Sequence, residues 1–237
     1  MNRPQEKQEN VFVSLLLNIA IPSLILMKFS KPEDLGPTKG LIVALAFPIL
    51  YGLYDFYDRK KFNFVSLLGF ISILLTGGIG LLELSAHWMA VKEAAIPALI
   101  GIAVMGSLKT KYPLVRTIFF NDKLIDVNKV NHALESKNNV KNFDQLLTKT
   151  SLLLSLSFFL SSILNYGLAK WILVSEPGTP AFNEELGRMT ALSYPVIVLP
   201  SMVVMMIALW VLMRGIKKLT GLTLEDVFHP PEKKAKT

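Results

Sequence analysis

The residues of this sequence most able to do chemistry are charged groups at the edges of long apolar stretches. Opposite charges brought to one depth in a membrane either pair as a structural network or form the mouth of an outward-facing cavity. In the second case the cations would meet an anionic group, while the carboxylates orient them or carry a proton. Both alternatives stay open from the sequence. The six candidates are Glu83, Lys92, Glu93, Glu184, Glu185 and Arg188.

Three further polar residues fall within the apolar stretches themselves. Asn18 and Asn165 lie near the middle of theirs, where an amide side chain can join two helices by hydrogen bonds. Asp55 lies near the end of its stretch, and we expect an interfacial carboxylate paired with Arg59.

Groupings typical of catalytic and metal sites are missing from the sequence. It has no cysteine, which excludes disulfide frameworks, thiol catalysis and cysteine zinc sites. His87, His132 and His229 are far apart, and no Ser–His–Asp grouping is evident. We therefore predict no catalytic residues, no metal, no cofactor and no enzymatic activity.

The composition places the chain in a membrane. Of 237 residues, 51% are hydrophobic and 18% are charged, which is more apolar than a typical soluble domain. The apolar residues form blocks of membrane-spanning length without the polar stripe of a soluble helix. We predict an all-α polytopic membrane protein with six transmembrane helices, at 11–27, 41–57, 62–82, 94–108, 151–174 and 191–213.

The distribution of basic residues predicts the orientation of these spans. With six spans, all but six of the 25 Lys and Arg residues lie on the side that holds both chain ends. By the positive-inside rule both termini are cytoplasmic. The net charge of +7 then indicates contact with anionic lipid head groups rather than nucleic acid. The six exceptions are Lys28, Lys31, Lys39, Lys92, Lys170 and Arg188.

The chain divides into membrane and cytoplasmic parts. In the long link, Asp126 is positioned to cap a short helix with Val130 and Leu134 on its buried face. Asn142 and Gln145 resemble a capping box that would start a second helix leading into the fifth span. The predicted parts are a cytoplasmic tail (1–10), spans one to four (11–108), a cytoplasmic amphipathic link (109–149), spans five and six (150–214) and a basic cytoplasmic tail (215–237).

A faint internal similarity suggests a repeat. Residues 19–22 resemble 94–97 in pattern, and residues 49–53 resemble 163–168. A 3+3 inverted repeat, which recurs in transporters, would explain both likenesses. Chance likeness between apolar segments is the alternative.

From the third span onward the chain resembles the intracellular septation protein A family of bacterial inner-membrane proteins. The resemblance rests on short motifs: Thr76 to Leu82 with its glycines, Trp88 and Lys92 heading the fourth span, Lys111 to Arg116, Asn165, and Asn183 to Gly187. It implies a multi-pass protein of the bacterial inner (cytoplasmic) membrane linked to envelope synthesis or septation, and it implies no enzyme.

Two functions follow as expectations. The first is support of cell-envelope synthesis or division through contacts with other membrane proteins or a second copy of the chain, using glycines such as Gly77 and Gly101. The alternative is a small transporter or lipid translocator for an anionic substrate, which would use Lys92 and Arg188.

Overall fold

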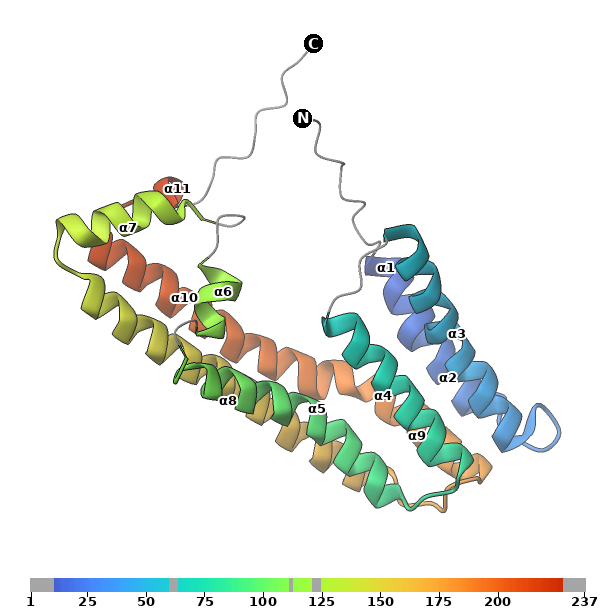
Figure 1. The fold of residues 1–237 in the computed structure, drawn as a ribbon. Helices are drawn as coiled ribbons and strands as arrows, with labels where there is room; N and C mark the ends of the chain where they lie inside the picture. Colours follow the sequence, from blue (N-terminus) through green and yellow to red (C-terminus); the bar gives the residue numbers. More distant parts are fainter. Residues whose placement is uncertain (1–10, 60–63, 111–112, 121–124, 228–237) are drawn as a thin grey trace, which may run out of the picture. The chain divides into compact units, whose positions relative to one another are not determined.

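The computed structural model describes residues 11–59, 64–110, 113–120 and 125–227, and every regular element within these ranges is helical (Figure 1). In chain order the helices are α1 (Val11–Leu15), the π-helix η1 (Leu16–Ala20), α2 (Ile21–Lys28), α3 (Gly36–Arg59), α4 (Phe64–Leu81), α5 (Ala86–Ser107), α6 (Leu114–Phe119), α7 (Val127–Ser136), α8 (Val140–Ile172), α9 (Pro180–Ser193), the π-helix η2 (Tyr194–Val198), α10 (Leu199–Thr220) and α11 (Leu224–Val227).

Four helical segments of the described chain are long and apolar enough to cross a membrane. They correspond to the second, fourth, fifth and sixth predicted spans, so the all-α, multi-pass prediction is confirmed for these. The four are Gly36–Asp55, Ala86–Ser107, Val140–Ile172 and Pro180–Thr220. The first and third predicted spans correspond to shorter apolar helices, Phe12–Lys28 and Phe70–Leu81 in the part of the chain searched.

Two of the apolar segments contain a π-helical turn beside a proline. The turn η1 directly precedes α2, whose second residue is Pro22, and η2 contains Pro195. Proline has no backbone N–H and its ring clashes with the carbonyl four residues earlier. A local change from i→i+4 to i→i+5 bonding relieves such a conflict without ending the helix.

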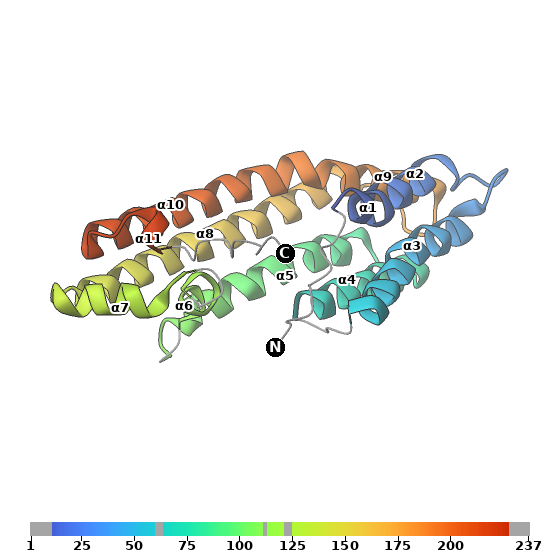
Figure 2. The same ribbon diagram turned by 90° about the horizontal axis from the view of Figure 1, so that it is seen from above.

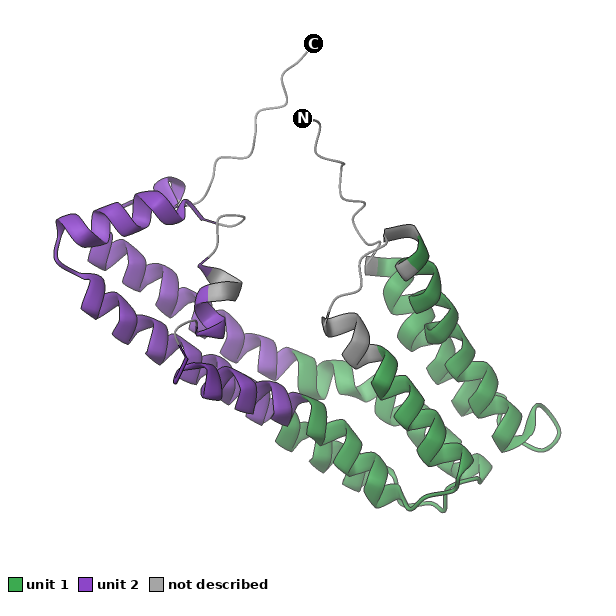
Figure 3. Cartoon of the chain, viewed as in Figure 1, with its two compact units in different colours: residues 1–96, 162–198 green, residues 97–161, 199–237 purple. Residues whose placement is uncertain are grey.

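The chain forms two compact units, coloured separately in Figure 3. Unit 1 comprises residues 1–96 and 162–198, and unit 2 comprises 97–161 and 199–237. Each unit has its own apolar core. The long helices α5 and α8 contribute residues to both units.

In unit 1, helix α9 packs against α2 and α3, and α3 packs against α4, as Figures 1 and 2 show. The α2–α9 approach is close because Gly187 has no side chain there. A Cβ atom at this position would lie 2.8 Å from the carbonyl oxygen of Ser23. The core of the unit includes the fully buried Met89 and Phe182.

Unit 2 confirms one predicted cap and corrects another. Asp126 caps α7 by accepting a hydrogen bond from the Lys129 backbone N–H at 2.9 Å, and Val130 and Leu134 are buried as predicted. The predicted capping box at Asn142 is wrong, because α8 already begins at Val140. Asn139 precedes the helix, accepts from the Asn142 amide at 2.8 Å, and donates to the Leu219 carbonyl at 2.9 Å.

The short helix α11 is tied to α7 by an ion pair. Lys129 Nζ lies 2.7 Å from Asp226 Oδ1, and Asp226 Oδ2 accepts from the backbone and hydroxyl of Thr223. The hydrogen bond from Lys129, followed by those from Thr223, holds the pKa of Asp226 well below its ordinary value of 3.8.

This lowered pKa predicts a pH-dependent contribution to stability. A carboxylate whose pKa falls on folding stabilises the fold above its unfolded pKa, and the effect is lost as the pH falls through the folded pKa. We expect the Asp226→Asn variant to melt at a lower temperature than the wild type at about pH 7, with the gap closing below about pH 4. Thermal unfolding of both purified proteins across this range checks it. A gap that does not change with pH would contradict the prediction.

Candidate functional site

Lys92 is a buried cation held among hydroxyl groups. It lies in the second turn of α5, and its side chain is 5% exposed. Its Nζ atom donates to Thr76 Oγ1 at 2.8 Å and to Ser72 Oγ at 3.4 Å, both from α4. It also lies 2.6 Å from Glu93 Oε1. A buried lysine needs such partners, because a bare charge in this environment is strongly disfavoured.

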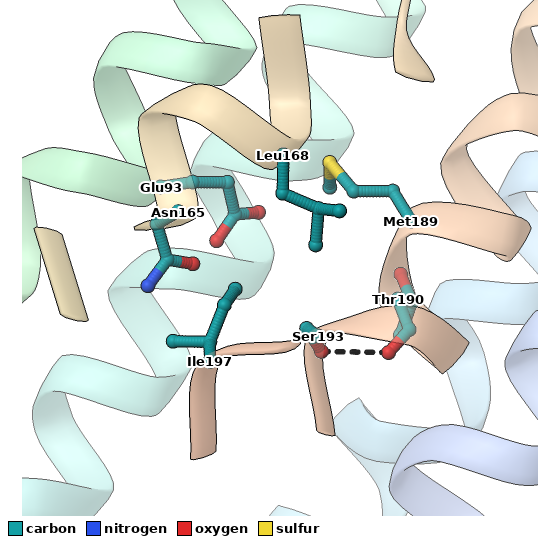
Figure 4. A pocket seen from close by; sticks show the side chains of 7 residues that line it. All are labelled: Glu93, Asn165, Leu168, Met189, Thr190, Ser193 and Ile197. Atoms are coloured by element: carbon teal, nitrogen blue, oxygen red, sulfur yellow. Dashed lines mark hydrogen bonds between the residues drawn. The ribbon is translucent and has the colours of Figure 1, made fainter. Parts of the chain in front are cut away.

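Glu93 connects this cation to a small polar cavity in unit 1. The cavity has a volume of about 120 Å³. Figure 4 shows the carboxyl group of Glu93 pointing into it, with side chains of α8, α9 and η2 around the same space. The residues that line it are Glu93, Asn165, Leu168, Met189, Thr190, Ser193 and Ile197.

The hydroxyl groups of the cavity are oriented by their own helix. Thr190 Oγ1 donates to the Leu186 carbonyl at 2.9 Å, and Ser193 Oγ donates to the Thr190 carbonyl at 2.7 Å (Figure 4). Each hydroxyl proton is therefore bonded within α9. The turn η2 follows immediately, so the cavity lies beside an interruption of the regular helical bonding, which is a frequent setting for functional sites.

Glu185, another of the six predicted charges, fixes a loop. Its Oε2 atom accepts from the backbone N–H groups of Val174 and Ser175 at 3.0 and 2.9 Å, and its Oε1 atom accepts from the Ser175 hydroxyl at 2.7 Å. This carboxylate joins α9 to the segment that follows α8. Its bonds to backbone N–H groups are those of a structural cap.

The other three of the six predicted charges are exposed. Glu184 and Arg188 are exposed on α9, and Glu83 lies in the turn after α4 with a φ of 52°. The Glu83 side chain lies against Gly178, where a Cβ atom would come within 2.6 Å of its Oε1. Among the described residues, Lys92 and Glu93 are the two of the six charges that form an ion pair with each other.

The three polar residues predicted inside spans have different surroundings. Asn18 donates to Ser14 Oγ at 3.1 Å, one turn earlier in the same apolar segment, rather than to a neighbouring helix. Asn165 lines the cavity with Glu93. Asp55 is half-buried near the end of α3, while the side chain of its predicted partner Arg59 is outside the described residues.

The sequence analysis missed the hydroxyl partners of this site. Ser72 and Thr76 are four residues apart and share one helix face, as do Thr190 and Ser193 at a spacing of three. The spacing of these hydroxyl residues was the feature of the sequence that could have indicated the site. This indication is weak, because single hydroxyl groups are common in apolar helices and also bond to their own helix.

Asn183 is a second buried polar residue whose role only the structure shows. It is 2% exposed, and its amide donates to Ser30 Oγ at 3.1 Å and to the Pro37 carbonyl at 2.7 Å. These bonds join α9 to Ser30, in the connection between α2 and α3, and to Pro37, in the first turn of α3. They give the buried Asn183 amide its partners.

We expect Asn183→Leu to lower the free energy of unfolding by about 1–3 kcal/mol, because the hydrogen bonds from this buried side chain to Ser30 and Pro37 are lost. Asn128→Leu on the exposed face of α7 is the matched control and should change it by less than about 0.5 kcal/mol. Unfolding of the purified variants in detergent measures both. Equal values for the two would show that the Asn183 bonds do not stabilise the fold.

No group of three or more His, Cys, Asp or Glu residues able to hold a metal ion occurs in the searched, described part of the chain. The four long apolar helices define the class: a helical multi-pass membrane protein. Comparison with known proteins finds no match among family models, curated proteins or solved structures.

Proposed function

We propose that the chain is a six-span protein of the bacterial inner membrane, with both termini cytoplasmic, that supports envelope synthesis or division through contacts with other membrane proteins. It has no catalytic step in this proposal. The placement of the residues that carry the resemblance to septation protein A supports it most. Lys92 and Asn183 are buried and bonded inside unit 1, and Asn165 lines its cavity. These short motifs therefore coincide with the polar interior of the unit.

The membrane arrangement has its own test. The shorter segments Phe12–Lys28 and Phe70–Leu81 complete six spans in this proposal, and the 3+3 inverted repeat would relate the first three to the last three. Reporter fusions that are active in only one compartment, placed after Thr237, before Met1 and within 31–35, check it. Both ends should report cytoplasmic and 31–35 should report periplasmic. Opposite compartments for the two ends would overturn it.

Contacts with partner proteins need open positions where helices can approach closely. Gly77 does not offer one, because a Cβ atom there would lie 3.1 Å from Leu45 of α3. Gly101 is similarly covered by Phe158 and Phe159 of α8. We therefore no longer propose Gly77 and Gly101 as the positions that contact partner proteins. Gly106, which has nothing within 4 Å of an added Cβ atom, is the better position on α5.

The matched pair Gly106→Leu and Gly101→Leu tests this contact. We expect Gly106→Leu to accumulate normally but to lose co-purification with division or envelope-synthesis proteins. Gly101→Leu should instead accumulate poorly, since its side chain meets Phe158 and Phe159. Deletion of the gene should lengthen cells or weaken the envelope. A protein that purifies alone, from cells whose septation does not depend on it, would contradict the proposal.

A small transporter is the second candidate, favoured by the cavity beside the ion pair of the buried Lys92 with Glu93. Ionisable residues inside membrane helices commonly mark transport pathways. In this case Lys92→Gln should abolish solute uptake into proteoliposomes while the protein still accumulates. Failure of that variant to accumulate would instead indicate that the pair is structural.

A further inference from the structure

We propose that the cavity of unit 1 binds a sodium ion, with Glu93 as its charged ligand. This goes beyond the proposed function and does not depend on it. The sequence suggested a site for an anionic substrate, whereas the charged group in this cavity is a carboxylate, which attracts cations. Lys92 is not among its lining residues, whereas the carboxylate of Glu93 is.

The uncharged groups of the cavity favour a cation because they present acceptor oxygens. Thr190 and Ser193 each donate their single hydroxyl proton to a carbonyl of α9. Since a hydroxyl oxygen keeps two lone pairs, both can still accept from, or coordinate, a group in the cavity. The side-chain amide of Asn165 lies in the same wall (Figure 4). Carboxylate, amide and hydroxyl oxygens are the ligands that hard cations take in proteins.

The charge around Glu93 sets the strength of this site. Lys92 is the charged group that faces it, at 2.6 Å from Oε1, while the lining residues from α8, α9 and η2 are uncharged. Lys92 is also held by Thr76 and Ser72 on the α4 side. The opposite charges of Lys92 and Glu93 balance each other. A cation bound in the cavity therefore shares the Glu93 carboxylate with Lys92. We expect weak, reversible binding.

The size of the cavity agrees with a small ion. A volume of about 120 Å³ is well below the 300–1,000 Å³ or so of sites for drug-sized organic ligands. A cavity of this size suits a small ion with its waters. The π turn η2 lies beside the cavity and locally changes the helical bonding there.

The test uses the full-length protein in lipid nanodiscs and radioactive ²²Na⁺ as the probe. For a sodium site we expect saturable binding that unlabelled NaCl competes away and choline chloride does not. Glu93→Gln should weaken the binding by about tenfold or more, because the charged ligand is lost. Glu184→Gln, which neutralises an exposed carboxylate outside the cavity, should leave it within about twofold.

A second arm locates the site. A hydrophobic carbodiimide reacts with protonated carboxyl groups, and mass spectrometry locates the adduct. NaCl should protect Glu93 from labelling, while choline chloride should not. The absence of saturable ²²Na⁺ binding, or labelling of Glu93 that NaCl does not reduce, would overturn the proposal.

Glu93→Gln leaves Lys92 without its carboxylate and can fail to fold, so a second variant keeps the test decisive. Ser193→Ala removes one acceptor oxygen and keeps the ion pair. It should weaken ²²Na⁺ binding by about fivefold. Ser162→Ala is the control, because Ser162 makes a similar bond to the Ala94 carbonyl at 2.8 Å but does not line the cavity. Equal effects of both would reject the assignment.

Discussion

Replacing Lys92 with methionine is expected to lower the free energy of unfolding by about 3–5 kcal/mol, the largest effect of any single charge removal in this chain. The variant keeps the length of the side chain but leaves the Glu93 carboxylate without its cation. It also removes the donor to Thr76 and Ser72. Reversible unfolding of the purified protein in bicelles measures the change.

A double variant separates lost pairing from lost packing. Lys92→Met combined with Glu93→Gln has no unpaired charge, so it should recover at least half of the stability lost in the single variant. Lys170→Met on the exposed surface of α8 is the control and should be nearly neutral. If Lys92→Met proves as stable as this control, the bonds of Lys92 to Glu93, Thr76 and Ser72 do not stabilise the fold.

Replacing Gly187 with leucine is expected to have the second large effect. Helix α9 approaches α2 so closely that even a Cβ atom would lie 2.8 Å from the Ser23 carbonyl oxygen and 3.0 Å from Leu26 Cβ. Backbone cannot move aside as the end of a flexible side chain can. We expect a loss of about 3 kcal/mol or more in stability, seen as low accumulation and a lowered melting temperature.

Gly167→Leu provides the matched control for this substitution. Gly167 lies in α8, is exposed, and has nothing within 4 Å of an added Cβ atom. Leucine there should be neutral or stabilising by up to about 1 kcal/mol, because glycine is a poor helix former. Similar losses at both positions would show that the α2–α9 contact is not the cause.

The sequence predicts the apolar helices well and their ends poorly. Apolar composition alone identifies the segments that become α3, α5, α8 and α10. It does not reveal that α8 begins eleven residues before its apolar block, although the capping pattern at Asn142 predicted a helix leading into this block from within three residues of the observed start. The bond from Asn139, just before the helix, to the Leu219 carbonyl far along the chain is not visible in the local pattern. The π turns η1 and η2 could not be predicted either, because a proline in a helix can lead to a kink, a break or a π turn.

The candidate site could be predicted only in part. Charged residues next to apolar stretches single out Lys92, Glu93 and Glu185, yet their chemistry depends on partners that are uncharged. Glu185 bonds to backbone N–H groups, which no composition signals. The cavity beside Glu93 requires Thr190 and Ser193 to approach from another helix. Such contacts follow from packing between distant segments rather than from local pattern.

The π turn η2 also changes how the last apolar segment should be probed by scanning mutagenesis. A π turn contains one residue more than an α turn, which offsets the following side chains by about 100° around the axis. A single helical wheel drawn through 180–220 therefore assigns the wrong face to every position after the turn. Two wheels, broken at Tyr194, are needed to choose positions for spin labels or cross-links in this segment.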